Sequence, residues 1–141
     1  MEEKVIWEGK PSGIIDSIKE KGGMNATTYT LTNERIIVKS GLLSKKQDDL
    51  ELVRVKDIRV TQGMKERLMK IGSVEITSTD SSTPSLTFVD VREPNEVKEL
   101  VRRAVKDAKS TSGVLIIYII SGNIKYIKLY QIIYVNLLTF K

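Results

Sequence analysis

The sequence contains neither cysteine nor histidine. Without cysteine the chain can form no disulfide framework and no catalytic thiolate, and it suits a reducing cytoplasm. Without histidine it lacks the commonest metal ligand and the commonest general base near neutral pH. Chemistry based on carboxylates alone, such as Mg²⁺ binding or glycoside hydrolysis, is compatible with this composition. We expect a protein that is not an enzyme and that uses no cofactor.

Long apolar runs are also missing. The longest, "VLIIYII" at 114–120, is much shorter than the ~20 residues that cross a bilayer as a helix. The start, "MEEKVIWEGKPSG", has no basic region followed by an apolar run, so it does not resemble a signal peptide. We expect a cytoplasmic protein, with peripheral attachment to the inner face of the membrane as an alternative.

The chain has a modest excess of positive charge. Its net charge is +5, of which +3 lies after Gly113, where Lys125, Lys128 and Lys141 occur without any acidic residue. The rest of the chain therefore carries only +2. A body so weakly basic has the charge of an ordinary solvated surface, and nucleic acid is an unlikely partner.

Alternation of apolar and polar residues predicts a series of short antiparallel strands. In "VKDIRVTQ", Val55, Ile58 and Val60 should point inward, and a one-residue slip near Asp57 predicts a bulge. Asn33 should make the tight turn of "YTLTNERIIVKSG" in a left-handed or Asx-turn conformation. The predicted strands are 4–9, 27–32, 35–41, 42–52, 55–62, 73–79 and 85–91.

One long amphipathic helix is predicted at 94–109. It begins with Pro94 and places six apolar residues on one face, namely Val97, Leu100, Val101, Ala104, Val105 and Ala108. A short helix should follow Ser12 and stop at Gly22, and a helical turn should lie between Gly63 and Gly72, with Met64, Leu68 and Ile71 on one side. Strands followed by one helix predict a mainly β fold, a curled sheet closed by a C-terminal helix.

Three stretches, combined in this order, resemble the bacterial pleckstrin-homology (PH) family. They are "YTLTNERIIVKSGLLSKKQDDLELVRVKDIRV" (29–60), "RLMKIGSVEI" (67–76) and the closing helix, with "WEGKPS" (7–12) similar to the family's lead-in. The resemblance implies a PH-like partly open barrel of two near-orthogonal antiparallel sheets capped by one α-helix. It implies no catalytic residues.

Two departures from the family pattern bear on function. Many relatives have a pair of membrane helices where this chain has only the short charged interval 13–28, so the resemblance implies a soluble version lacking those helices. PH relatives that bind phosphoinositides use a basic first hairpin. The equivalent loop here, 9–26, has Lys10, Lys19 and Lys21, but the strand 27–32 after it has no basic residue, and the headgroup motif is not met.

Two charged clusters are candidate sites. Asp48, Asp49 and Glu51 could form a carboxylate site, but strand alternation splits them between two faces, which favours a solvated surface. The densest basic stretch is the candidate anionic-binding surface. It consists of Lys56, Arg59, Lys65, Arg67 and Lys70.

The chain divides into a PH-like domain at 1–113, with a lead-in at 1–26 and a core at 27–109, and an apolar Ile/Tyr/Lys-rich tail at 114–141. The tail could form two strands that pair with a sheet edge or a second subunit, could lie on a membrane surface, or could be a dispensable extension or translation artefact. We expect a non-enzymatic PH-like binding module for a protein partner or for itself as a homo-oligomer. The alternative is a peripheral membrane or anionic-lipid binder that uses residues 56–70.

Overall fold

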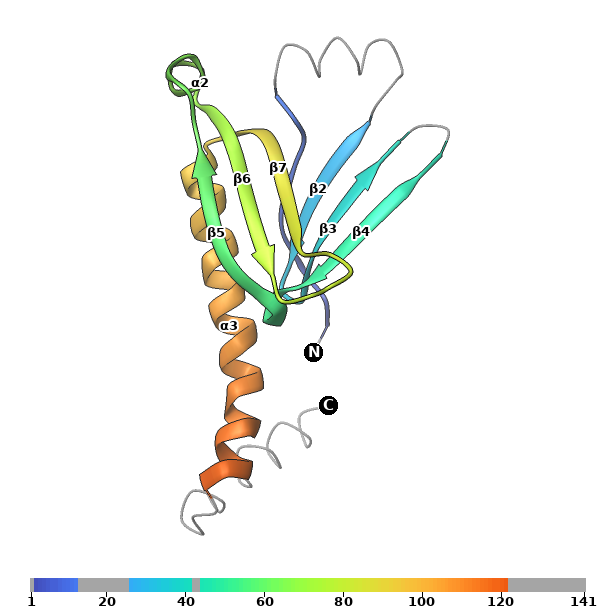
Figure 1. Cartoon of the computed structure of the whole chain (residues 1–141), viewed down its shortest axis with the longest axis vertical. Helices are drawn as coiled ribbons and strands as arrows, with labels where there is room; N and C mark the ends of the chain where they lie inside the picture. Colours follow the sequence, from blue (N-terminus) through green and yellow to red (C-terminus); the bar gives the residue numbers. More distant parts are fainter. Residues whose placement is uncertain (1, 13–25, 42–43, 122–141) are drawn as a thin grey trace. The chain divides into compact units, whose positions relative to one another are not determined.

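A computed structural model describes residues 2–12, 26–41 and 44–121 (Figure 1). The chain separates into two compact units, Met1–Ala108 and Lys109–Lys141. The strands and the first part of the long helix belong to the first unit. The short helix predicted after Ser12 lies outside the described residues.

The first sheet contains four antiparallel strands in the order β1-β2-β3-β4. They are β1 (Val5–Gly9), β2 (Thr27–Thr32), β3 (Arg35–Ser40) and β4 (Lys46–Glu51). Strand β2 has the predicted bounds, with Tyr29 and Leu31 buried in the core. Thr30 and Thr32 are buried as well, although alternation predicts that they lie on the opposite face, because β2 is an inner strand between β1 and β3.

The second sheet has three antiparallel strands in the order β5-β6-β7. They are β5 (Val55–Thr61), β6 (Ile71–Ser78) and β7 (Ser85–Arg92), and a short turn η1 (Leu52–Arg54) leads into β5. The predicted bulge is confirmed, since the β5–β6 register shifts between Val55 and Asp57. The two sheets do not close into a barrel, which agrees with the partly open barrel expected from the family resemblance.

Three aromatic side chains join the two sheets. Phe88 of β7 is completely buried and stacks against Trp7 of β1, with ring centroids 5.4 Å apart. It also meets Tyr29 of β2 at 4.8 Å. The Tyr29 hydroxyl accepts a hydrogen bond of 3.0 Å from the backbone N–H of Val89 in β7. Trp7 therefore holds the two sheets together through Phe88.

Glycine is needed at position 9 so that Trp7 can reach this cluster. A Cβ atom at Gly9 would lie about 2.3 Å from the ring of Trp7, too close for the ring to keep its place. The two residues share a face of β1 because side chains alternate along a strand.

Helix α3 spans Pro94–Ser121 and is longer than predicted. The predicted end at 109 is wrong, and residues 114–120, which could also have formed a strand, are helical. Within the first unit, the predicted apolar face is the one that packs: Val97, Val101, Ala104 and Val105 are buried, while Leu100 and Ala108 are half-buried against the core.

We expect a chain that ends at Gly113 to fold as the parent does. Among the residues of α3 whose side chains the structure describes, those that pack on the core end by Ala108, and the cut removes none of these. Circular dichroism should show a cooperative transition near the melting temperature of the parent, and light scattering should show less association. A chain cut after Leu100, which loses Val101, Ala104 and Val105, is the matched control and should not fold. Failure of the Gly113 chain to fold would mean that the tail is integral to the domain.

Candidate binding groove and basic surface

Strand β5 has a free edge. In the part of the chain that the structure describes, β5 pairs only with β6, and its other edge has no strand partner. The first turns of α3 lie alongside this edge (Figure 1). An unpaired strand edge presents a row of backbone N–H and C=O groups that a further strand can use.

A groove of about 640 Å³ runs between this edge and α3. Half-buried Ile58 and Val60 contribute apolar surface to it, and polar groups surround them. The complete lining is Ile58, Arg59, Val60, Thr61, Gln62, Arg67, Asn95 and Lys98. Its size is within the range of pockets that hold small molecules or short segments of chain.

The charges that line the groove are all positive. Arg59, Arg67 and Lys98 come from three different elements, and no carboxylate is among the described residues that line the groove. Among the described residues, none of these three side chains forms an ion pair within 4.0 Å. The nearest acid along the ladder is Glu75, opposite Arg59 in β6. Unpaired guanidinium and ammonium groups in one groove suit a carboxylate or phosphate ligand.

The short helix α2 (Met64–Leu68) forms the tip of the β5–β6 hairpin (Figure 1). The prediction that Met64, Leu68 and Ile71 share one side of it is wrong. Ile71 is buried in β6, whereas Met64 is 88% exposed and Leu68 is 87% exposed. Lys70 explains the difference: its left-handed backbone, with φ of 55°, redirects the chain so that Ile71 enters the sheet while the helix stays outside.

The structure distributes the five predicted cations over three places. Arg59 and Arg67 line the groove, and Lys65 and Lys70 lie exposed on and just after α2. Lys56 lies at the opposite end of β5, beside the bulge, and is not part of the groove. Lys98 was not predicted, because nothing in the helix pattern indicates which strand that helix turn faces.

The carboxylates Asp48, Asp49 and Glu51 each meet a different cation. Asp48 pairs with Lys46 at 3.1 Å, Asp49 with Arg35 at 2.9 Å and Glu51 with Arg54 at 3.5 Å. Within the described residues, no group of three acidic side chains is placed to hold a metal ion. Their arrangement fits a solvated, ion-paired strand face.

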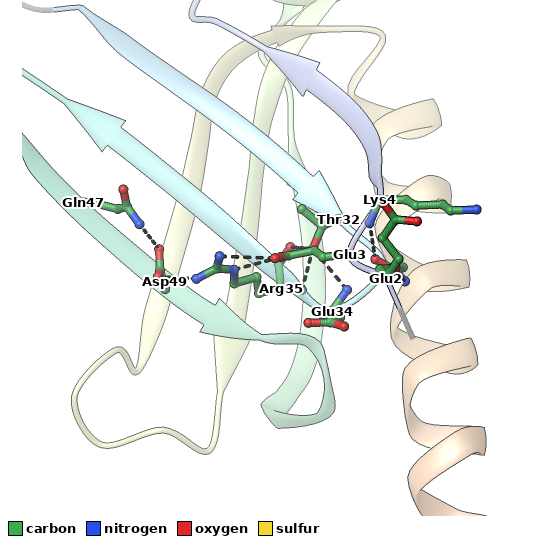
Figure 2. Close-up of polar contacts among 9 residues, drawn as sticks. Glu2, Glu3, Lys4, Thr32, Glu34, Arg35, Gln47 and Asp49 are labelled. Carbon is green, nitrogen blue, oxygen red and sulfur yellow. Dashed lines mark hydrogen bonds and ion pairs between the residues drawn. The ribbon is translucent and has the colours of Figure 1, made fainter. Parts of the chain in front are cut away.

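The turn between β2 and β3 is a clamp for the first residues of the chain. Arg35 donates bonds of 2.8 and 3.2 Å to the two carboxylate oxygens of Glu3 (Figure 2). The buried Thr32 hydroxyl donates to the same carboxylate at 2.9 Å. These bonds, chiefly those from Arg35, lower the pKa of Glu3. The network therefore has a structural role.

Asn33 also belongs to this clamp, and the prediction of a left-handed or Asx-turn conformation for it is wrong. It is not among the residues with positive φ. Its side-chain oxygen accepts a bond of 2.7 Å from the N–H of Lys4, and its side-chain nitrogen donates to the carbonyl of Glu2. The side chain is thus used for a contact distant in the sequence, which a local turn rule does not consider.

Comparisons with known proteins agree with this architecture. A family model described as a bacterial PH domain matches residues 21–105. No curated protein matches the chain. No helix in the described ranges has a segment long and apolar enough to cross a membrane.

Proposed function

The chain belongs to the bacterial PH domain family, and we propose that it is a non-enzymatic module that binds an extended acidic segment of a partner protein along the free edge of β5. PH-like domains are in general binding modules for proteins or lipids. The observation that carries this proposal is the groove between β5 and α3, where an unpaired strand edge lies beside three unpaired cations.

Both the free edge of β5 and the cations of the groove contribute to binding such a segment. The backbone edge of β5 can hydrogen-bond to an added strand, which supplies affinity with little dependence on sequence. Arg59, Arg67 and Lys98 then select for carboxylate or phosphorylated side chains in the added strand. The side chains of Ile58 and Val60 provide apolar surface against which the added strand can pack.

The same charges argue against a second copy of the chain at this edge. If two β5 strands paired with each other, the two sets of groove cations would be brought together without any lining carboxylate to neutralise them. An acidic partner segment replaces this repulsion by attraction. Of the two partners expected from the sequence, the groove therefore favours a different protein over self-association.

A selection from a random peptide library tests the proposal directly. Peptides selected on the full chain should be enriched in acidic residues. The double variant Arg59→Glu with Lys98→Glu should bind them about tenfold or more weakly, because two charge-assisted contacts are lost. Lys39→Glu with Lys106→Glu, two exposed lysines outside the groove, is the matched control and should bind as the parent does.

Amide hydrogen exchange locates the bound peptide. Exchange in β5 should slow when a selected peptide is bound, and exchange in β4, an edge strand of the other sheet, should not change. Peptides that bind the groove variant as tightly as the parent, or protection confined to β4, would overturn the proposal. A selection that yields no specific peptide would overturn it too.

A further inference from the structure

The tip of the β5–β6 hairpin carries apolar side chains that are largely exposed. Met64 and Leu68 are the most exposed large apolar residues among those described, at 88% and 87%, and Met69 is 48% exposed. Met64 and Leu68 are four positions apart in α2, so they lie on the same side of the helix. Two such residues at the apex of a hairpin form an exposed apolar pair that a soluble surface does not need.

The backbone holds this apolar pair away from the core. Inside the tip, the N–H of Arg67 bonds the carbonyl of Gly63 at 3.0 Å, and that of Met69 bonds the carbonyl of Lys65 at 3.1 Å. The carbonyl of Lys70, the left-handed residue, accepts a 2.9 Å bond from Glu93 at the end of β7. With the turn tied down at both ends, rotation of side chains alone cannot bury Met64 and Leu68.

Cations surround the apolar pair. Lys65, Arg67 and Lys70 are exposed, and none is in an ion pair with another described residue. Glu66 is the one acid between Gly63 and Gly72, and its carboxylate is occupied by the backbone N–H of Gly63 at 2.7 Å. Exposed apolar side chains with basic neighbours are the composition of a segment that binds at a membrane interface.

The rest of the first unit has a matching charge asymmetry. Ser12, just after β1, donates a 2.7 Å bond to Asp90 near the end of β7, so these strand ends lie at the same end of the unit as α2 (Figure 1). The end of β3 and the start of β4 lie on the same side of the unit (Figure 1), and exposed Lys10, Lys39 and Lys45 add to the positive charge there. The opposite end, with the β2–β3 turn and η1, carries Glu2, Glu34 and Glu51 together with Lys4, Arg35 and Arg54, so the charges of these six residues offset one another. Among these residues, the unbalanced positive charge therefore lies on the side of α2.

We propose that α2 is a docking tip for anionic lipid bilayers, in which Met64 and Leu68 enter the interface and Lys65, Arg67 and Lys70 contact the headgroups. The tip is a second surface, distinct from the protein-binding groove, and Arg67 alone belongs to both. Of the basic stretch 56–70 that the sequence indicated for lipid binding, the docking tip includes only residues 64–70. Neither Lys56 nor the first hairpin is part of it.

Vesicle binding of the full chain tests the tip. The parent should bind phosphatidylcholine vesicles with about 30% phosphatidylserine much more tightly than pure phosphatidylcholine vesicles. Lys65→Glu with Lys70→Glu should weaken binding by about 25-fold or more, at about fivefold for each cation lost. Met64→Ser with Leu68→Ser should weaken it by about tenfold or more. Val5→Ser with Val53→Ser, exposed apolar residues at the opposite end, should have no effect.

A site-specific probe separates the tip from any contribution of residues 114–141. Because the chain has no cysteine, Met64→Cys can be labelled at a single position with an environment-sensitive fluorophore. Its emission should shift to the blue on acidic vesicles, and that of labelled Val53→Cys should not. No shift at position 64, or tip variants that bind acidic vesicles as the parent does, would overturn the inference; an apolar protein surface would then be the occupant of the tip.

The peptide-binding groove and the lipid-docking tip can be tested independently of each other. Arg59→Glu with Lys98→Glu leaves Met64, Lys65, Leu68 and Lys70 in place and should retain vesicle binding. The tip variant Met64→Ser with Leu68→Ser leaves the groove cations in place and should retain binding of the selected peptides. Loss of both activities in either variant would show that one surface, and not two, carries them.

Discussion

Replacing Val101 by aspartate should abolish cooperative folding of the chain. Val101 is completely buried in the middle of the packed face of α3. The substitution removes about 1.5–3 kcal/mol of apolar burial and puts a carboxylate at a completely buried position in the apolar core. A buried, unpaired charge costs several kcal/mol more, and the total is comparable with the ~5–15 kcal/mol that stabilises a domain of this size.

Arg103→Asp is the matched control for this variant. It introduces the same side chain at an exposed position of the same helix, where the cost is limited to about 0.5 kcal/mol of helix propensity. Thermal melts followed by circular dichroism should show a cooperative transition for Arg103→Asp and none for Val101→Asp. If both variants melted within a few degrees of the parent, α3 would be peripheral to the core, contrary to the observed burial.

Phe88→Ala should lower the free energy of unfolding by about 3–5 kcal/mol. Phe88 packs against the rings of both Trp7 and Tyr29, which come from the opposite sheet. Truncation leaves a cavity between the sheets, because the backbone of β1 and β2 is held by its own hydrogen-bonded ladder and cannot collapse to fill it. The loss of two aromatic contacts adds about 0.5–1.5 kcal/mol each, part of which is already included in the truncation cost.

Urea unfolding measures this effect with two probes. Trp7 is the only tryptophan in the chain, so its fluorescence reports on the environment of position 88, while circular dichroism reports on the whole domain. Thr87→Ala, an exposed neighbour on the same strand, is the control and should change stability by less than about 0.5 kcal/mol. A Phe88→Ala protein as stable as the Thr87→Ala protein would mean that the aromatic cluster does not join the sheets.

Most of the strands could be predicted because their pattern is local. The pairs Tyr29 with Leu31 and Ile58 with Val60 alternate with polar residues, and alternation is a property of the strand itself. The same is true of the apolar stripe of α3, whose face was correct from Val97 to Val105. The end of α3 was not predictable in this way. Glycine at 113 and the β-branched residues after it favour a break, yet the helix continues through them.

The candidate sites, unlike the strands, could be predicted only in part, because they depend on contacts between distant parts of the chain. The sequence by itself determined that cations are dense between Lys56 and Lys70, that no cysteine or histidine chemistry is available, and that β5 is a strand with a bulge near Asp57. Only the tertiary structure decided which cations line the same groove. Arg59, Arg67 and Lys98 do so because the first turns of α3 lie beside β5, and that arrangement joins parts of the chain far apart in sequence.

The exposure of the tip at Met64 and Leu68 was also decided by the tertiary structure. Helical spacing places Met64, Leu68 and Ile71 on one side of a helical turn, and apolar residues that share one side of a helix usually face the core. A left-handed backbone at Lys70, tied to Glu93 by a hydrogen bond, sends Ile71 into the sheet and leaves Met64 and Leu68 outside. Lysine has no intrinsic preference for that conformation, so the surrounding fold imposes it. Local patterns thus specify the elements of this protein, while packing between distant segments determines which side chains remain available to bind.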